Sequence, residues 1–123
     1  MNKIKIKILL VEDDRFISEI YYRKLSENNF DVKLAQDGLA AIRMFEEFQP
    51  DFVLLDILLP KKSGWEVLKE LKTNKKNQAR FIMLTNLGEK EKIKQALEMG
   101  AEDYLIKSSL TPSELVETMK DKI

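Results

Sequence analysis

The sequence of 123 residues contains no cysteine and no histidine. Without cysteine the chain has no disulfide framework and no thiolate chemistry. Without histidine it has no imidazole general base, no imidazole metal ligand and no histidine phosphoacceptor of its own. Any bound metal must therefore be held by oxygen atoms, which favours a hard cation such as Mg²⁺.

Long apolar runs and an excess of one charge are missing as well. No segment approaches the roughly 20 apolar residues that span a bilayer, and residues 3–8 alternate lysine with isoleucine instead of forming a secretory signal. These absences predict a cytoplasmic protein. The 21 basic and 21 acidic residues cancel, so the charge gives no reason to expect direct binding to nucleic acid or to a membrane.

Short apolar runs alternate with amphipathic helical patterns along the chain, which predicts a single domain over residues 1–123 with no output domain. We expect strands at 4–11, 30–34, 51–56, 81–84 and 104–106, and helices at 15–27, at 65–73 and after Gly38, Gly88 and Thr111. The expected buried helix faces include Ile20, Leu97 and Ile123. This fivefold βα alternation predicts an α/β fold with a parallel sheet covered on both faces.

Polar side chains stand where four of the predicted strands end: Glu12 and Asp13, Asp56, Thr85, and Lys107. Ligands of such sheets bind at the carboxyl ends of the strands. The spacing therefore predicts one site with three carboxylates, one hydroxyl and one ammonium group.

Three neighbouring carboxylates repel one another, so a cation is expected among them. A divalent metal with oxygen ligands is the simplest choice, and Mg²⁺ leaves positions for phosphate oxygens. A carboxylate can also attack phosphorus to form an aspartyl phosphate. Asp56 is the best candidate nucleophile because it ends the central strand, while Lys107 and Thr85 would neutralise and bind the transferred group.

Four segments in this order and spacing resemble the receiver domain of two-component response regulators. They are Leu9-Leu10-Val11-Glu12-Asp13-Asp14, residues 52–60, residues 83–85 and residues 100–107, and the resemblance covers essentially the whole chain. It implies a flavodoxin-like, doubly wound (βα)5 fold with five parallel strands in the order 2-1-3-4-5.

The resemblance also implies a role for each site residue. Asp56 would accept a phosphoryl group from a histidine kinase or a phosphotransfer protein, with Thr85 and Lys107 contacting that group and Tyr104 acting as an aromatic switch. Mg²⁺ would be held by Glu12, Asp13, Asp56 and the backbone carbonyl of Leu58. The phosphorylated domain would present the face of the fourth helix, fifth strand and fifth helix to a downstream protein, as a monomer or a phosphorylation-linked dimer. It would not be an enzyme, beyond assisting its own phosphorylation and dephosphorylation.

Four residues depart from the pattern of that family or vary within it. Ser108 follows Lys107 where proline is usual, so we expect either a trans bond with a shifted loop or a strained cis bond. Asn86 replaces a small residue after Thr85 and is expected to crowd either the phosphoryl pocket or the path of Thr85, which would affect the efficiency of the switch more than the chemistry. Leu58 and Leu87 flank the route of an attacking water, which predicts slow loss of the phosphoryl group.

Three other functions fit the sequence less well. A metal-dependent hydrolase that uses Asp56 would usually carry a second aspartate two residues later, where this chain has Leu58. A nucleotide-binding enzyme would need a G-x-G or G-K-[ST] motif, and the four glycines form neither. A receiver-like interaction module that no longer depends on phosphorylation remains open because of Asn86 and Ser108.

Overall fold

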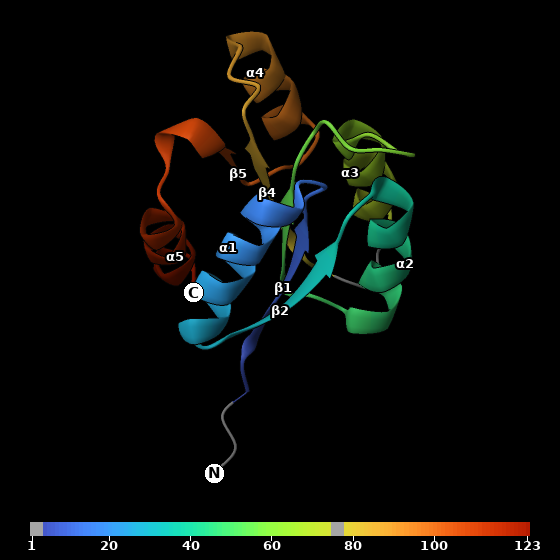
Figure 1. Ribbon diagram of the computed structural model, residues 1–123. Coiled ribbons are helices and arrows are strands. Elements are labelled where there is room, and N and C mark those ends of the chain that lie inside the picture. The colour runs from blue at the N-terminus through green and yellow to red at the C-terminus, as the bar shows by residue number, and fades with distance from the viewer. Residues whose placement is uncertain (1–3, 75–77) are drawn as a thin grey trace.

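The computed structural model describes residues 4–74 and 78–123, which form a five-stranded parallel sheet between two layers of helices (Figure 1). The strand order β2-β1-β3-β4-β5 confirms the predicted topology. The expected turn at 74–78 falls largely on residues 75–77, outside the described residues. In the described ranges, no helix combines the length and apolarity needed to cross a membrane. The elements are β1 (Ile6–Val11), α1 (Arg15–Glu27), β2 (Phe30–Ala35), α2 (Gly38–Phe48), β3 (Phe52–Leu55), α3 (Gly64–Lys72), β4 (Arg80–Thr85), α4 (Lys90–Glu98), β5 (Asp103–Ile106), the 3-10 turn η1 (Lys107–Ser109) and α5 (Pro112–Asp121).

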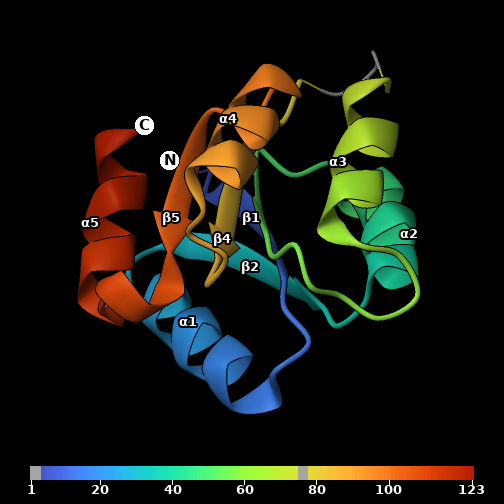
Figure 2. The same ribbon diagram turned by 90° about the horizontal axis from the view of Figure 1, so that it is seen from above.

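The central strands are buried on both faces because their successive side chains enter two different hydrophobic clusters. On one face, Leu9 of β1 belongs to a cluster with Phe45 of α2 and Leu68 of α3. On the other face, Ile8 belongs to a cluster with Leu115 of α5. Figures 1 and 2 show α1 and α5 on one side of the sheet and α2 and α3 on the other. The helices cover both faces of the sheet, so a functional site is expected at the ends of the strands.

Hydrogen bonds at the helix ends agree with the sequence signals. The predicted start of α5 is confirmed, because Thr111 Oγ1 accepts the Glu114 N–H at 3.1 Å and the Glu114 carboxylate accepts the Thr111 N–H at 2.8 Å. A second capping box, formed by Ser63 and Glu66, begins α3. Gly100 follows α4 with a φ of 103°, the left-handed conformation expected of a glycine after a helix.

Three side chains that were expected to be buried are exposed. The exposed fractions are 37% for Ile20, 46% for Leu97 and 69% for Ile123. Helical periodicity predicts an apolar stripe, but the neighbouring elements decide which part of that stripe is covered. In α1 the small Ser18 takes a buried position beside the sheet, and Ile123 lies beyond α5, which ends at Asp121.

Candidate phosphoacceptor site

Two acidic side chains stand at the ends of the central strands. Beyond β1, the Glu12 N–H donates to the Ala35 carbonyl at 3.0 Å, and beyond β3 the Asp56 N–H donates to the Val11 carbonyl at 3.2 Å. These bonds continue the pairing of the parallel strands past their ends. The two residues are therefore fixed side by side at the ends of neighbouring strands. Only 2% of Glu12 and 5% of Asp56 is exposed.

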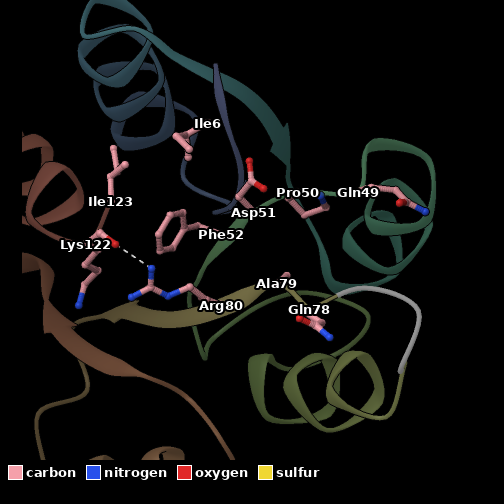
Figure 3. Close-up of a pocket in the computed structure, with 10 residues that line it drawn as sticks. All are labelled: Ile6, Gln49, Pro50, Asp51, Phe52, Gln78, Ala79, Arg80, Lys122 and Ile123. Carbon is pink, nitrogen blue, oxygen red and sulfur yellow. Dashed lines mark hydrogen bonds between the residues drawn. The ribbon is translucent and has the colours of Figure 1, made fainter. Parts of the chain in front are cut away.

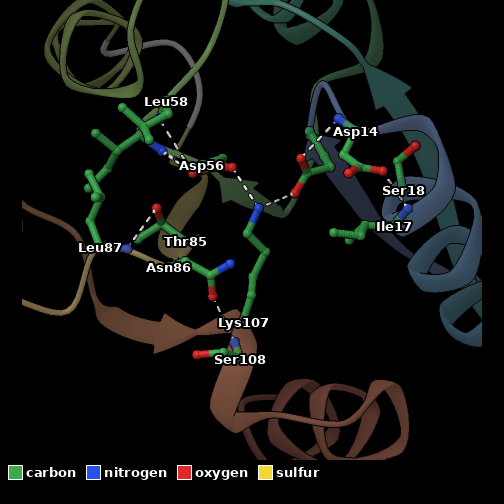
Figure 4. Close-up of polar contacts among 12 residues, drawn as sticks. Asp14, Ile17, Ser18, Asp56, Leu58, Thr85, Asn86, Leu87, Lys107 and Ser108 are labelled. Carbon is green, nitrogen blue, oxygen red and sulfur yellow. Dashed lines mark hydrogen bonds and ion pairs between the residues drawn. The ribbon is translucent and has the colours of Figure 1, made fainter.

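Lys107 contacts both of these carboxylates (Figure 4). Its Nζ lies 2.6 Å from Glu12 Oε1 and 2.7 Å from Asp56 Oδ2, and 9% of its side chain is exposed. Lys107 follows β5, so its side chain crosses the end of β4 to reach them. The predicted meeting of strand ends is confirmed. The second contact, to Glu12, had no signal in the sequence.

Asp13 adds a third carboxylate, and it is exposed. Oxygen atoms of Glu12, Asp13 and Asp56 lie within 4.8 Å of one another. Lys107 compensates one of the three negative charges and leaves two, which suits a divalent cation. The donor set is all oxygen and partly open to solvent, and it therefore fits Mg²⁺, which takes a few carboxylates and retains several waters.

The environment shifts the pKa of two of these groups. Burial raises the pKa of the Glu12 carboxyl, although hydrogen bonds from Lys107 and from the Asp14 N–H act in the opposite direction. Burial acts to lower the pKa of Lys107, but the hydrogen bonds and charges of Asp56 and Glu12 outweigh it and hold that pKa above its ordinary value. Lys107 is therefore a permanent cation between the carboxylates at neutral pH.

The predicted hydroxyl lies at the end of β4. Thr85 is 1% exposed, and its Oγ1 accepts a long hydrogen bond of 3.4 Å from the Leu87 N–H. This contact uses a lone pair of the oxygen, so the hydroxyl proton remains able to donate. The hydroxyl of Tyr104 on β5 donates to the Leu87 carbonyl, and its ring packs against the cluster beneath α2 and α3. Tyr104 thus joins β5 to the loop that follows Thr85.

Two of the residues that depart from the family pattern, Asn86 and Ser108, contact each other. The Lys107–Ser108 peptide bond is trans, as in the first of the two expected geometries, and residues 107–109 form a 3-10 turn. The Ser108 N–H donates to Asn86 Oδ1 at 2.8 Å. Asn86 is exposed, and its amide oxygen is directed at the loop after β5. The sequence singled out both residues separately, but nothing in it indicated that they would pair.

A family model of the response regulator receiver domain matches residues 8–120 of this chain. The chain belongs to the response regulator receiver domain family. Chemotaxis protein CheY of Halobacterium salinarum is 35% identical to this receiver domain over 108 residues, which are 87% of the chain and 88% of that protein. The probable transcriptional regulator ycf27 of Guillardia theta is 39% identical over 90% of the chain but only 42% of its own length. This receiver domain therefore spans less than half of that regulator.

Solved structures agree with the fold of this receiver domain. A CheY-like response regulator receiver domain protein from Methanospirillum hungatei superimposes with a TM-score of 0.89 at 27% identity, covering 97% of this chain and 94% of that one. The N-terminal receiver domain of Klebsiella pneumoniae RstA, solved in a BeF3-activated form, gives a TM-score of 0.85 at 32% identity, with coverages of 93% and 95%. Both comparisons support the predicted flavodoxin-like architecture.

In this receiver domain Leu58 and Leu87 lie on the same side of Asp56 (Figure 4). Leu58 is 64% exposed, and its N–H lies 3.4 Å from Asp56 Oδ1, while Leu87 is partly buried. The Ile57 N–H donates to the same oxygen at 2.7 Å. One side of the Asp56 carboxylate is therefore bordered by hydrocarbon, and one of its oxygen atoms is held by the main chain.

A pocket of about 480 Å³ lies at the opposite, amino-terminal edge of the sheet in this receiver domain (Figure 3). Arg80 enters it from β4 and is fully engaged, because its guanidinium donates to the Glu102 carboxylate and to the Lys122 carbonyl. It also lies over the Phe52 ring, 4.8 Å from the centroid. Arg80, Glu102 and Lys122 bind one another, so these charged groups join the ends of elements at this edge of the sheet.

Proposed function

We propose that this receiver domain is switched by Mg²⁺-dependent phosphorylation of Asp56. The observation that carries the proposal is the triangle of Glu12, Asp56 and Lys107, with contacts of 2.6 and 2.7 Å at the carboxyl edge of the sheet. A buried carboxylate beside a fixed ammonium group is positioned both to attack phosphorus and to have the resulting charge neutralised. The chain has no histidine, so a phosphohistidine donor would belong to a partner, a histidine kinase or a phosphotransfer protein.

In the transfer step an oxygen of Asp56 forms a bond to phosphorus while the bond from phosphorus to the donor nitrogen breaks. Lys107 neutralises charge on the phosphoryl oxygens, and the Thr85 hydroxyl donates a hydrogen bond to one of them. The main-chain N–H of Ile57 holds the other oxygen of the acceptor. Glu12, Asp13 and Asp56, together with the Leu58 carbonyl, would hold Mg²⁺, which when bound supplies positive charge to the transferring group.

The switch would act through the loop after β4. A phosphoryl group adds a charge of about −1.5 to −2 and attracts the Thr85 hydroxyl. Thr85 is connected to Leu87 and Tyr104 by the hydrogen bonds of that loop, so its movement changes the surface made by α4, β5 and α5. We take this surface as the docking site for a downstream protein.

We infer that the domain assists only its own phosphorylation and dephosphorylation and turns over no other substrate. An acid or base placed to protonate a leaving group is expected in a hydrolase of this kind. The side chain two residues after Asp56 is Leu58, which can neither donate nor accept a proton.

Incubation with Mg²⁺ and acetyl phosphate, followed by intact-mass measurement, tests the proposal. The parent protein should gain the mass of one phosphoryl group, and Asp56→Asn should gain none. Asp31→Asn, which removes a carboxylate from β2, should behave like the parent. A parent protein that gains no mass, like the Asp56→Asn variant, would favour a receiver-like interaction module that no longer depends on phosphorylation.

A further inference from the structure

The loops after β4 and β5 are tied by the contact between Asn86 and Ser108. The Ser108 N–H donates to Asn86 Oδ1 at 2.8 Å, although the two residues lie 22 positions apart in the chain. Strand pairing matches Thr85 with Ile106, so the next residues, Asn86 and Lys107, leave the sheet at the same level. The contact therefore joins the two loops beside the groups that would bind the phosphoryl oxygens.

This hydrogen bond determines which way the Asn86 amide points. A backbone N–H can only donate, so the atom that faces Ser108 must be the amide oxygen. The amide nitrogen then points in another direction, and Figure 4 shows it on the side of the Lys107 side chain. None of the described residues supplies a hydrogen-bond acceptor for this nitrogen, since the bond from Ser108 is the one hydrogen bond that the Asn86 side chain makes with them. The two N–H donors of the amide are consequently available to a ligand.

We propose that Asn86 is a further phosphoryl-binding residue, whose amide nitrogen donates a hydrogen bond to an oxygen of the group carried by Asp56. The inference rests on the proposed phosphorylation of Asp56. Asn86 would work beside Thr85 and Lys107, as a neutral donor next to a hydroxyl and an ammonium group. An asparagine at this position then contributes to binding the phosphoryl group instead of crowding it out.

Ser108 is the positioning partner in this arrangement. A proline at the same place has no N–H and could not fix the amide oxygen of Asn86. The two departures from the family pattern therefore depend on each other, because the donor function of Asn86 requires a residue with an N–H after Lys107. With the trans peptide bond and the 3-10 turn over residues 107–109, the Ser108 N–H points toward Asn86 in the loop after β4.

Binding of beryllofluoride at saturating Mg²⁺, measured by calorimetry, tests the role of Asn86 directly. Asn86→Ala removes the donor and should weaken binding by about threefold to tenfold, the size of one hydrogen bond. Asn86→Asp keeps an oxygen for the Ser108 N–H but replaces the donor by a negative charge, so it should weaken binding more than Asn86→Ala does. The concentration of acetyl phosphate that gives half of the maximal phosphorylation rate should rise in the same order.

Ser109→Ala, an exposed substitution in the same turn, is the matched control and should bind beryllofluoride like the parent. Equal affinity of Asn86→Ala and the parent overturns the inference. It is also overturned if Asn86→Asp binds as tightly as the parent while Asn86→Ala binds less tightly, because Asn86 would then act only through its bond to Ser108. A parent protein that binds no beryllofluoride and gains no phosphoryl group would instead refute the proposed phosphorylation itself.

Discussion

Lys107 occupies a position in which it would compete with a metal ion for the carboxylates. Its ammonium group contacts Glu12 and Asp56, two of the three carboxylates that form the acidic cluster. Nearly the whole side chain is withdrawn from solvent, so water screens the charge only weakly. The same lysine that would neutralise a phosphoryl group would therefore also limit how tightly the unphosphorylated carboxylates hold a cation.

Replacement of Lys107 by methionine should raise the affinity for Mg²⁺ by about tenfold, equivalent to about 1.4 kcal/mol. The variant removes a positive charge from the carboxylates while it keeps the length of the side chain. Titration calorimetry with Mg²⁺ measures the effect. The control is Lys62→Met, which removes a lysine paired with the exposed Glu70 and should leave the affinity for Mg²⁺ unchanged. A Lys107→Met variant that binds Mg²⁺ no more tightly than the parent would contradict the proposed competition.

Leu58 is the residue from which we expect control over the lifetime of the phosphoryl group. Its exposed hydrocarbon side chain borders the acceptor and offers no hydrogen bond to an attacking water. Leu58→Asn should speed the loss of phosphate from the purified phosphoprotein severalfold, because an amide can orient that water. The loss can be timed by intact mass. The control is Leu39→Asn, which changes another exposed leucine, on α2, and should leave the rate of phosphate loss unaltered. Equal rates for Leu58→Asn and the parent would show that Leu58 does not control the lifetime of the phosphoryl group.

At the scale of elements, the start of α3 lies directly against the backbone of Asp56 and Ile57. A Cβ atom added to Gly64 would stand 2.1 Å from the Asp56 carbonyl oxygen and 2.7 Å from the Ile57 Cα. The Gly64 N–H also donates to the Ile57 carbonyl at 2.8 Å. The backbone after Asp56 can therefore follow its path only if the residue that begins α3 has no side chain.

Gly64→Ala should lower the free energy of unfolding by about 1–3 kcal/mol, because backbone atoms must move to admit the methyl group. It should also reduce phosphorylation of Asp56, since the displaced backbone carries the acceptor. Urea unfolding and intact mass measure the two effects. Gly88→Ala is the control, because its Cβ would meet only Ile106 Cδ1 at 3.5 Å, an ordinary contact. Similar stabilities of the two variants would show that the loop after β3 adapts.

Across the whole molecule, charged side chains at the amino-terminal edge of the sheet connect elements on the side opposite the site. Glu102 pairs with Arg80 of β4 at 2.6 Å and with Lys122, after α5, at 3.5 Å. Lys122 also lies 2.9 Å from Asp103 of β5. The network holds α5 to the sheet at one end, while the loops of the acceptor site remain at the other.

The contribution of Glu102 to stability should depend on pH. The hydrogen bond from Arg80 holds the pKa of the Glu102 carboxyl below its ordinary value of 4.5. A lowered pKa in the folded state means that the stabilisation is complete above pH 4.5 and disappears as the pH falls through the lower, folded value. At pH 7, Glu102→Gln should be less stable than the parent by up to about 1 kcal/mol, because the group is partly screened by solvent.

Urea unfolding without Mg²⁺ from neutral pH to below pH 4.5 measures this dependence. The difference between Glu102→Gln and the parent should shrink on acidification. The control is Glu98→Gln, which changes an exposed carboxylate of α4 and should be as stable as the parent over the whole pH range. If the stability difference between Glu102→Gln and the parent stayed constant or increased in acid, the ion pair with Arg80 would not be the cause of that difference.

The sequence by itself determined the class of the fold and the residue types that meet at the candidate site. Alternating apolar runs and helical periods define five βα units, because burial patterns and turn signals are local properties of the chain. The positions of these units show which polar residues stand at the strand ends, and the prediction that Asp56 is the acceptor follows from its place at the end of the central strand. The cap at Thr111 and the turn at Gly100 were also predictable, since each depends on only a few neighbouring residues.

The tertiary structure alone decided which of these groups touch. That Lys107 contacts Glu12 as well as Asp56, and that Ser108 binds Asn86, depends on the register of strands and the paths of loops that are distant in sequence. The same holds for the exposure of Leu97, because periodicity marks an apolar face but not the neighbour that covers it. Local pattern predicts elements and residue types, whereas distances between side chains on different elements follow from how those elements pack.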